Sequence, residues 1–272
     1  MEWETVTAPA GVAPPRPITV RAQSLPARHY FPEHAHGWHQ MAYAISGVLS
    51  VAVQGRSLVI SPEQAVWLPA GLRHRVGTLP GAEFRSLWIA TGAGSELPDR
   101  PTVFGVSALL RALIVEAAAM DGKDDPDGYK DRLTGLILDQ LRRARPLPGA
   151  LPWPAAGPLV KLCEALYADP ADLRGPEAWG RALGMSGRTL ARRFEAQLGM
   201  SLRSWRRRLR LFRAVELLGG GLGVTETALQ LGYGSTSAFI YAFRTGMGCS
   251  PQAYMRGEPP DRNAIARQTF VP

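Results

Sequence analysis

The sequence predicts a two-domain α+β protein, in which a small antiparallel β-barrel with flanking helices precedes an all-helical domain. The 272 residues are enough for two domains of about 100 to 150 residues each. Short apolar runs with a period of two fill the amino-terminal part, whereas helical spacing fills the carboxy-terminal part. A proline-rich stretch, "RARPLPGALPWPAAGP", lies between them and indicates a domain boundary.

The barrel is expected in residues 18–100, after a disordered tail at residues 1–17. The tail, "MEWETVTAPAGVAPPRP", has acidic residues near its start and no apolar segment of the kind found in targeting peptides. The stretch "SGVLSVAVQGRSLVIS" alternates apolar and polar residues around Gln54-Gly55, which predicts a hairpin. "QAVWLPAGLRHRV" and "AEFRSLWIA" add further short strands, and such a series without helices is typical of an antiparallel barrel or sandwich.

Helical periodicity begins in residues 101–145. Two amphipathic helices are predicted here, separated by the acidic turn "DGKDDPDG". Their apolar faces are wide for a monomer surface, so the helices either cover the barrel or form the seam of a homodimer. The apolar positions are Leu109, Leu110, Leu113, Ile114 and Ala117 in the first helix, and Leu133, Leu136, Ile137 and Leu141 in the second.

A proline-rich linker is expected at residues 146–157 and a helical domain at residues 158–257, followed by a tail at residues 258–272. Closely spaced prolines make such a linker semi-rigid. The periodicity predicts helices at about 158–168, 176–183, 187–198, 201–218, 224–231 and 235–246, and a short one from Pro251.

Charge and composition narrow the function. Residues 1–150 hold 15 Lys and Arg against 14 Asp and Glu, whereas residues 151–272 hold 16 against 9. A basic helical domain is the electrostatic footprint of nucleic-acid binding. Two distant cysteines and the lack of a long apolar run favour a cytoplasmic protein that does not enter membranes. No nucleophile triad or phosphate-binding loop is found, so no enzymatic activity is expected.

One pattern occurs twice in the basic half. "PEAWGRALGMSGRTLARRFEAQLG" and "VTETALQLGYGSTSAFIYAFRTGMG" each contain a short helix, a glycine-bearing turn and a second helix. Glycine suits the left-handed residue after the first helix, and Ser186 and Ser235 can cap the second helices. Two helix-turn-helix units are therefore predicted, with Leu190, Phe194, Phe239, Ile240 and Phe243 in their cores.

The helix between these units has an arginine-rich side. In "SLRSWRRRLRLFRAVELL" one face is apolar and predicted to be buried. Beside two DNA-reading units, some of the arginines on the remaining surface would meet phosphate. The buried face consists of Leu202, Trp205, Leu209, Phe212 and Val215, and the arginines are Arg206, Arg207, Arg208, Arg210 and Arg213.

These residues carry a resemblance to a known family. "RALGMSGRTLARRFEAQLGMSLRSWRRRLRLFRAVELL" and "ALQLGYGSTSAFIYAFRTGMGCSPQAYM" resemble the DNA-binding domain of AraC/XylS-type transcription regulators over about 100 residues. Met247 departs from the aromatic residue usual in that family, and "LGGGLGV" is unusually rich in glycine. The resemblance implies two helix-turn-helix units that read adjacent turns of the major groove of double-stranded DNA.

Exposed early positions of each second helix are expected to reach base edges. Arginine can pair with guanine through two hydrogen bonds, whereas Ser, Thr and Tyr serve phosphate or base. The candidates are Gly187, Arg188, Thr189, Arg192 and Arg193 in the first unit, and Ser235, Thr236, Ser237, Tyr241 and Arg244 in the second.

Three of the five histidines lie in "EHAHGWHQ", near the amino terminus. His34 and His36 face the same side if they lie on a strand, and Gln40 follows across a turn. The spacing from His34 to Gly47, together with Pro69-x-Gly71-x-x-His74, resembles both motifs of the cupin barrel. In that family these positions are metal ligands, with Glu where this chain has Gln40. His39 is a spare ligand or a surface residue facing the other way.

Three neutral imidazoles and an amide oxygen suit nickel, cobalt, copper or zinc better than magnesium or calcium. Gln40 removes one negative charge, which favours the exchangeable binding that a sensor needs. "HxHxWxQ" with "AVWLPAGLRH" resembles a subgroup that includes nickel-responsive repressors. The alternatives are a small organic effector held by the same residues, a barrel without a ligand and, in another class, a metal-dependent cupin enzyme tethered to DNA.

Overall fold

The structure is a computed structural model that describes residues 3–7, 14–62, 64–120, 125, 127–144 and 150–256. The chain divides into two compact units, Met1–Ala150 and Leu151–Pro272. The division falls inside the stretch predicted to be a linker. Residues 145–149 of that region and the predicted tail at 258–272 lie outside the described residues.

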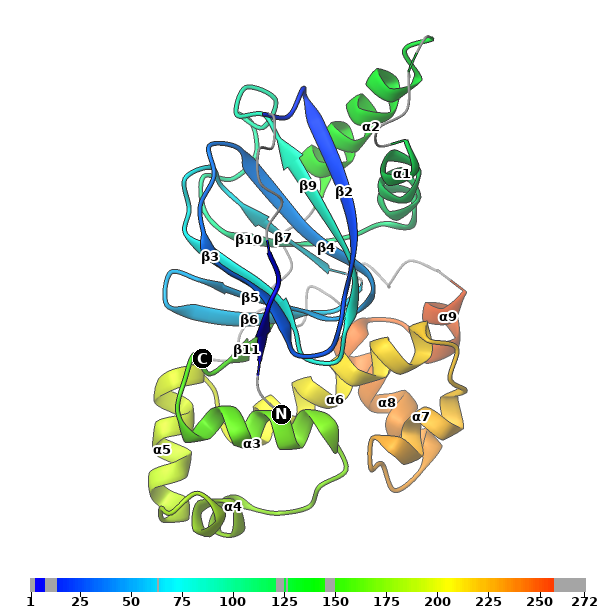
Figure 1. The fold of residues 1–272 in the computed structure, drawn as a ribbon. Helices are drawn as coiled ribbons and strands as arrows, with labels where there is room; N and C mark the ends of the chain where they lie inside the picture. The colour runs from blue at the N-terminus through cyan, green and yellow to red at the C-terminus, as the bar shows by residue number, and fades with distance from the viewer. Residues whose placement is uncertain are drawn as a thin grey trace. The chain divides into compact units, whose positions relative to one another are not determined.

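The amino-terminal unit is a β-sandwich with two helices, as the sequence predicted (Figure 1). Neighbouring strands are antiparallel except for β1, which runs parallel to β3. One sheet has the order β1-β3-β8-β5-β6 and contains Glu4–Thr5, His29–His34, His74–Thr78, Leu49–Val53 and Arg56–Ile60. The other has the order β10-β7-β4-β9-β2 and contains Thr102–Gly105, Gln64–Leu68, His39–Gly47, Ala82–Ile89 and Ile18–Leu25.

The central strand β4 is buried on both faces over residues 40–44, and its side chains alternate between two cores. Ala42 and Ala44 point into the core between the sheets, whereas Met41 and Tyr43 point into a second core beneath the helices. Successive residues of a strand face opposite sides, so Gln40 shares the inner side with Ala42. The strand therefore directs Gln40 into the sandwich and His39 away from it.

Two sequence-based predictions for this unit, the hairpin and the tail, have different outcomes. The predicted hairpin at Gln54-Gly55 is confirmed, because Val53 pairs with Arg56 and both turn residues have positive φ, 50° and 71°. That conformation matches the twist of the flanking strands. The predicted tail differs in part, because Glu4–Thr5 forms a short strand against His29–Tyr30, which the tail's composition does not indicate.

Helices α1 (Ala108–Ala119) and α2 (Tyr129–Arg143) cover the outer face of the second sheet. Ser107 caps α1 by accepting a hydrogen bond from the backbone N–H of Leu110 at 3.1 Å. The buried positions include Leu110, Ile114, Leu133 and Ile137, which pack against the sheet. Other predicted apolar positions stay outside: Leu109 is 54% exposed and Leu136 is 50% exposed.

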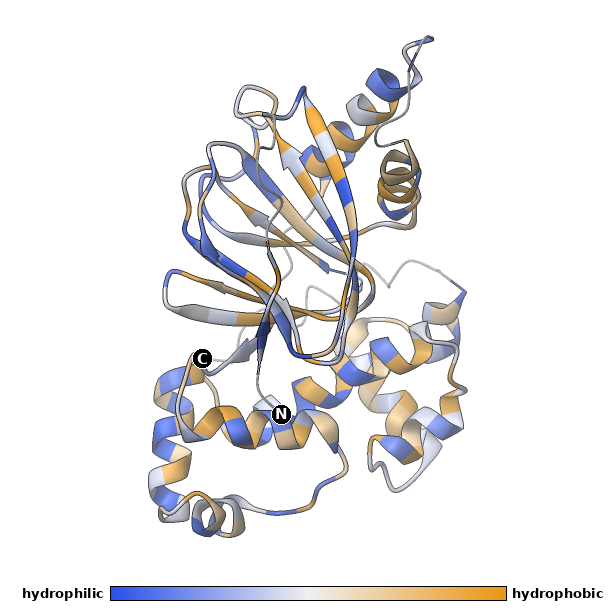
Figure 2. Cartoon of the chain, in the orientation of Figure 1, coloured by the Kyte–Doolittle hydropathy of each residue, from blue (hydrophilic) through white to orange (hydrophobic). Residues whose placement is uncertain are grey.

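The carboxy-terminal unit is helical after a short strand, β11 (Leu151–Trp153), that lies within the predicted linker. Apolar and polar residues alternate around its helices, as Figure 2 shows. None of the helices in the described ranges is long and apolar enough to cross a membrane. The helices are α3 (Pro158–Ala168), α4 (Pro176–Ala182), α5 (Gly187–Leu198), α6 (Leu202–Gly219), α7 (Val224–Gln230), α8 (Thr236–Met247) and α9 (Pro251–Met255), close to the predicted ranges.

Candidate metal centre and DNA-binding surface

The structure brings together His34, His36 and His74. His34 ends β3 and pairs with His74, the first residue of β8, while His36 follows in the connection to β4. That connection is held in place because the carbonyl of His36 accepts the N–H of Gly71 at 2.8 Å. One ring nitrogen from each histidine lies within 4.8 Å of those of the other two.

Backbone carbonyls fix which nitrogen of each ring faces the cluster. Nδ1 of His34 lies 2.7 Å from the carbonyl of Pro32, and Nδ1 of His74 lies 2.8 Å from that of Leu72. Nδ1 of His36 lies 2.8 Å from the carbonyl of Trp38, two residues further along the chain. A carbonyl can only accept, so each Nδ1 carries the proton and each Nε2 presents a lone pair. This is the arrangement that orients metal-binding imidazoles.

His74 is the most deeply buried of the three. Its Nε2 is fully buried and has no hydrogen-bond partner in the described part of the chain. Burial lowers the pKa of His74 to about 4, and the neighbouring His34 and His36 add to the decrease. The ring is therefore neutral at pH 7 and available as a ligand. A buried nitrogen lone pair without a donor is costly unless a cation or a proton meets it.

Gln40 completes the cluster from β4. Its Oε1 lies 3.1 Å from Nε2 of His36, and its amide nitrogen donates to Oγ of Ser86 at 2.6 Å. With Nδ1 of His36 carrying the proton, two acceptors face each other across that distance. A cation between them relieves the conflict; without one, a 180° rotation of the amide would do so. Ser86 was not predicted, because only the pairing of β4 with β9 places it here.

An aromatic wall closes one side of the cluster. The ring of Trp38 stacks on His36 with centroids 5.1 Å apart and an angle of 6° between the planes. Trp88 lies 5.3 Å from Trp38, again between centroids. Stacking holds the plane of His36, so Trp38 orients this ligand although it cannot bind a metal itself.

The structure places His39 away from the cluster. It faces the other way, as the second alternative stated, but it is half-buried and not a surface residue. Its Nδ1 accepts the N–H of Ala70 at 3.1 Å, and its ring stacks on Trp67 at 4.8 Å. Burial holds the pKa of His39 below its ordinary value, although a hydrogen bond to the backbone of Thr91 acts in the opposite direction. Both ring nitrogens are therefore engaged within the protein.

The residues present fit a transition metal. Bonds of about 2.1 Å hold opposite ligand nitrogens no more than about 4.2 Å apart, so the rings need only a small closure from their present spacing. Neutral imidazoles with one amide oxygen are ligands for nickel, cobalt or zinc.

The two helix-turn-helix units share one turn geometry. Gly184 and Gly232 follow the first helix of each unit with φ of 70° and 71°, and the residues after them donate N–H groups to Gly180 and Ala228 at 2.9 and 3.0 Å. These bonds satisfy carbonyls that a helix end leaves free. The predicted serine caps are confirmed: Ser186 accepts from Thr189 N–H, and Ser235 from Ala238 N–H, both at 3.1 Å.

The predicted reading residues differ in their surroundings. Arg188, Arg192 and Arg193 are exposed and make no hydrogen bond or ion pair within the described ranges. Gly187 instead faces α4, because a Cβ there would lie 3.0 Å from the backbone N of Glu177. Thr189 accepts a hydrogen bond from the hydroxyl of Ser186 at 2.9 Å. In the second unit Ser235, Ser237, Tyr241 and Arg244 are exposed and Thr236 is half-buried.

One core prediction is wrong. Ile240 was predicted to be buried with Phe239 and Phe243, but it is 37% exposed, whereas both phenylalanines are fully buried. It follows Phe239 directly, and successive helical positions are rotated by about 100°, so the two side chains cannot both face the core centre.

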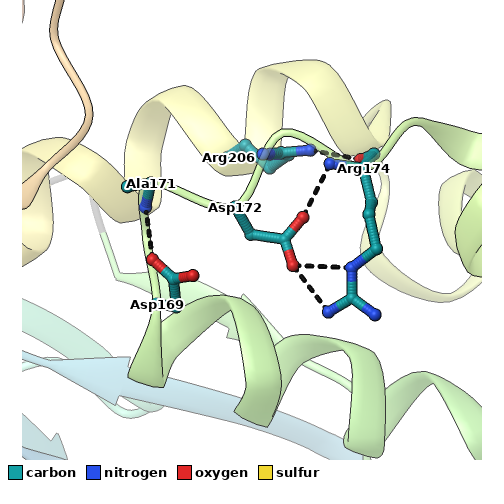
Figure 3. Close-up of polar contacts among 5 residues, drawn as sticks. All are labelled: Asp169, Ala171, Asp172, Arg174 and Arg206. Atoms are coloured by element: carbon teal, nitrogen blue, oxygen red, sulfur yellow. Dashed lines mark hydrogen bonds and ion pairs between the residues drawn. The ribbon is translucent and has the colours of Figure 1, made fainter.

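Several arginines of α6 hold the unit together rather than facing outward. Arg206 donates to the carbonyl of Arg174 at 2.7 Å, and Arg210 donates to that of Pro170 at 3.0 Å. Figure 3 shows Arg206 beside Asp172, which accepts the backbone N–H and the guanidinium of Arg174. The Arg174 guanidinium also lies 3.7 Å from the centre of the Trp179 ring in α4. The loop between α3 and α4, which contains Asp172 and Arg174, therefore contacts both α4 and α6.

Arg213 belongs to a buried polar cluster between α3 and α6. Glu216 accepts hydrogen bonds from the hydroxyl of Tyr167 at 2.7 Å and from Arg213 at 2.9 Å. Burial raises the pKa of Glu216, and Arg213 and Tyr167 oppose that rise. Because the folded state then retains a proton longer than the unfolded chain, stability falls as pH rises above the ordinary Glu pKa.

Replacing Arg213 by glutamine is expected to raise the pKa of Glu216 further and to cost about 2 kcal/mol at pH 7.5, since a charged hydrogen bond to a buried carboxylate is lost. The loss should shrink at pH 5, where the carboxyl group can take up a proton. Urea unfolding of the full chain at both pH values measures this. Arg207→Gln, at an exposed position of the same helix, is the control; an equal loss for Arg213→Gln at the two pH values would contradict the expectation.

Comparison with known proteins agrees with this architecture. A family model described as a helix-turn-helix domain matches residues 179–257, and one described as an AraC-like ligand binding domain matches residues 18–94. The HTH-type transcriptional regulator NimR of Escherichia coli K12 is 30% identical over 224 residues, which are 82% of each chain. The chain belongs to the AraC family of transcription regulators.

Two further comparisons show lower similarity. The HTH-type transcriptional regulator RipA of Corynebacterium diphtheriae is 29% identical over 226 residues, 79% of this chain and 61% of that protein. The crystal structure of ToxT from Vibrio cholerae O395 aligns with a TM-score of 0.39 and 13% identity, covering 88% of this chain and 97% of that one. Membership makes the chain a DNA-binding regulator with a ligand-binding domain, and not an enzyme.

Proposed function

We propose that this regulator controls promoter binding in response to a divalent transition metal held by His34, His36 and His74. The observation that carries the proposal is the convergence of three ring nitrogens whose protons are fixed on the far side of each ring by backbone carbonyls. These three nitrogens offer lone pairs at one point, which is the arrangement that a single cation requires. Nickel, cobalt and zinc are the candidates.

Gln40 is the proposed fourth ligand, through its Oε1. A neutral amide in place of a carboxylate leaves one negative charge fewer around the ion, so the ion binds less tightly and exchanges with the surroundings. When bound, the metal supplies cross-links between β3, β4 and β8 and takes part in no reaction. Trp38, stacked on His36, would transmit ring movement to the inner face of β9 through Trp88.

DNA contact is proposed for the exposed positions at the start of α5 and α8. Four cationic side chains are offered to the duplex: Arg188, Arg192 and Arg193 in α5 and Arg244 in α8. Arginine forks suit both guanine and phosphate. Thr189, Ser235, Thr236, Ser237 and Tyr241 are the proposed polar contacts, whereas Gly187 contributes the close approach of α5 to α4.

A homodimer is proposed through the outer faces of α1 and α2. Leu109, Val115 and Leu136 are each at least 43% exposed although they lie on helices whose other faces are buried. A second copy would cover these side chains and place four reading helices on paired half-sites, which raises the effective concentration for the second half-site.

The metal must favour one of two arrangements of the chain to act as an effector, because a ligand that binds both equally shifts neither. A coupling of about tenfold in DNA affinity is expected, which is ordinary for such linkage. The probe is a duplex selected from a random pool by the full-length protein, and its affinity is measured by fluorescence anisotropy with Ni²⁺ present and after chelation.

Sedimentation of the same samples should show two chains on each duplex. Unchanged DNA affinity while the metal is bound would refute the sensor assignment, and one chain on each duplex would refute the dimer. If no ion binds, the effector is a small organic molecule held by the same residues, or the barrel has none.

A further inference from the structure

The two reading helices can be compared position by position. Both α5 and α8 are 12 residues long, begin after a serine cap and end before a glycine in the left-handed conformation, Gly199 and Gly248. Counted from the serine caps, their inward positions coincide. Leu190 corresponds to Phe239, Phe194 to Phe243 and Leu198 to Met247. The same face of each helix is therefore turned outward.

The outward positions differ in chemistry. The first helix presents mainly charged groups, whereas the second presents a hydroxyl, an aliphatic chain and an aromatic ring at the matching places. Ile240 is 37% exposed and Tyr241 is 74% exposed, side by side in the sequence on a helix whose apolar residues would be expected to face the core. The pairs are Arg188 with Ser237, Ala191 with Ile240, and Arg192 with Tyr241.

Each surface suits a different base pair. Guanine presents two acceptors, N7 and O6, in the major groove and is matched by the two-pronged guanidinium of arginine. Thymine presents a methyl group there, which apolar side chains contact. The guanidinium groups of Arg188 and Arg192 have a hydroxyl and an aromatic ring at the matching positions of α8, and Ile240 adds an aliphatic chain where α5 has only Ala191. The two helices therefore offer different contacts to the bases.

We propose that the two helices recognise different base pairs: α5 takes guanine through Arg188 and Arg192, and α8 takes thymine methyl groups through Ile240 and Tyr241. The binding site is then asymmetric, with a guanine-bearing segment about one helical turn of DNA from a thymine-bearing segment. The connecting helix α6, with 18 residues, is about 27 Å long and separates the units accordingly. This inference rests on the proposed contact of both helices with DNA.

The experiment uses the full-length protein and the duplex that it selects from a random pool. Thymines are replaced by deoxyuracil one segment at a time, which removes only the methyl group. Guanines are replaced separately by 7-deazaguanine, which removes N7. Each contacted methyl group that is lost should weaken binding by about fourfold, and each contacted N7 acceptor that is lost by about tenfold. These losses are expected in two different segments.

Matched variants assign the segments to the helices. Ile240→Ala with Tyr241→Ala should bind more weakly and lose its response to deoxyuracil, while keeping its response to 7-deazaguanine. Tyr241→Phe retains the ring and should keep both responses. Arg192→Ala should behave in the opposite way, losing part of the guanine response only. All three changed side chains are exposed, so the thermal unfolding temperature should stay as in the unchanged protein.

The outcomes separate this inference from the proposed function. If the double variant keeps the full deoxyuracil response, or if deoxyuracil has no effect anywhere in the selected duplex, the assignment of α8 to thymine is wrong. If the unchanged protein selects no duplex at all, the proposed promoter binding fails first, and the assignment of bases fails with it.

Discussion

Replacing His36 by alanine is expected to weaken binding of Ni²⁺ to the full chain by at least about a hundredfold, because one of three imidazole ligands and the contact with Gln40 are lost together. The same is expected for His74→Ala, whose buried nitrogen has no other partner in the described residues. Calorimetric titration of chelator-stripped protein with nickel, cobalt and zinc measures the affinity. Saturation near one ion per chain is expected before mutation.

Two further histidines serve as controls. His29 lies outside the cluster with its Nδ1 near the carbonyl of Ala27, so His29→Ala should bind metal like the unchanged chain. His39→Ala removes a ring that packs on Trp67, so it should affect stability more than affinity. If His36→Ala still bound one ion with unchanged affinity, the three histidines would not be the site. If only His39→Ala failed to bind the ion, His39 would be a metal ligand and the three clustered histidines would not.

The histidines and the glutamine of the candidate metal centre could be predicted from the sequence, because their spacing follows a recognisable pattern. His34, His36 and Gln40 lie within a single short stretch, and the turn before His74 carries a recognisable Pro-x-Gly pattern. Partners from distant strands gave no such signal. Ser86 reaches Gln40 only through the register of β4 on β9, and the contact of Trp38 with Trp88 depends on the same pairing.

Helix positions could be predicted more completely than the faces of the helices. Serine caps and glycines in the left-handed conformation mark the ends of α5 and α8, so local residues suffice to place them. The exposure of each apolar residue is harder to predict. Where a helix has more apolar residues than the core beside it can bury, the sequence does not show which of them stay exposed. Ile240 and Leu136 are both such cases, because each lies at the margin of an apolar face.

Trp205 joins three elements of the DNA-binding unit. It is fully buried in α6, and its indole N–H donates to the carbonyl of Pro152 in β11 at 2.7 Å. Its ring lies 5.8 Å from those of Trp153 and Phe194, measured between centroids. Phe194 belongs to α5, so the orientation of the first reading helix depends on this ring. The strand after the domain boundary is anchored by the same side chain.

Trp205→Ala is expected to destabilise the carboxy-terminal unit by about 4 kcal/mol, because a large buried ring is removed and the carbonyl of Pro152 loses its donor. Trp205→Phe keeps most of the apolar contact and should cost about half as much. Hydrogen exchange of the full chain distinguishes the units: amides of α5 and α6 should exchange up to about a thousandfold faster in Trp205→Ala. Amides of β4 and β9 are the internal control and should be unchanged. Unaltered protection of α6 would show that the ring fills space without fixing the helices, and the reading face of α5 would then have to be positioned by the loop around Arg174 alone.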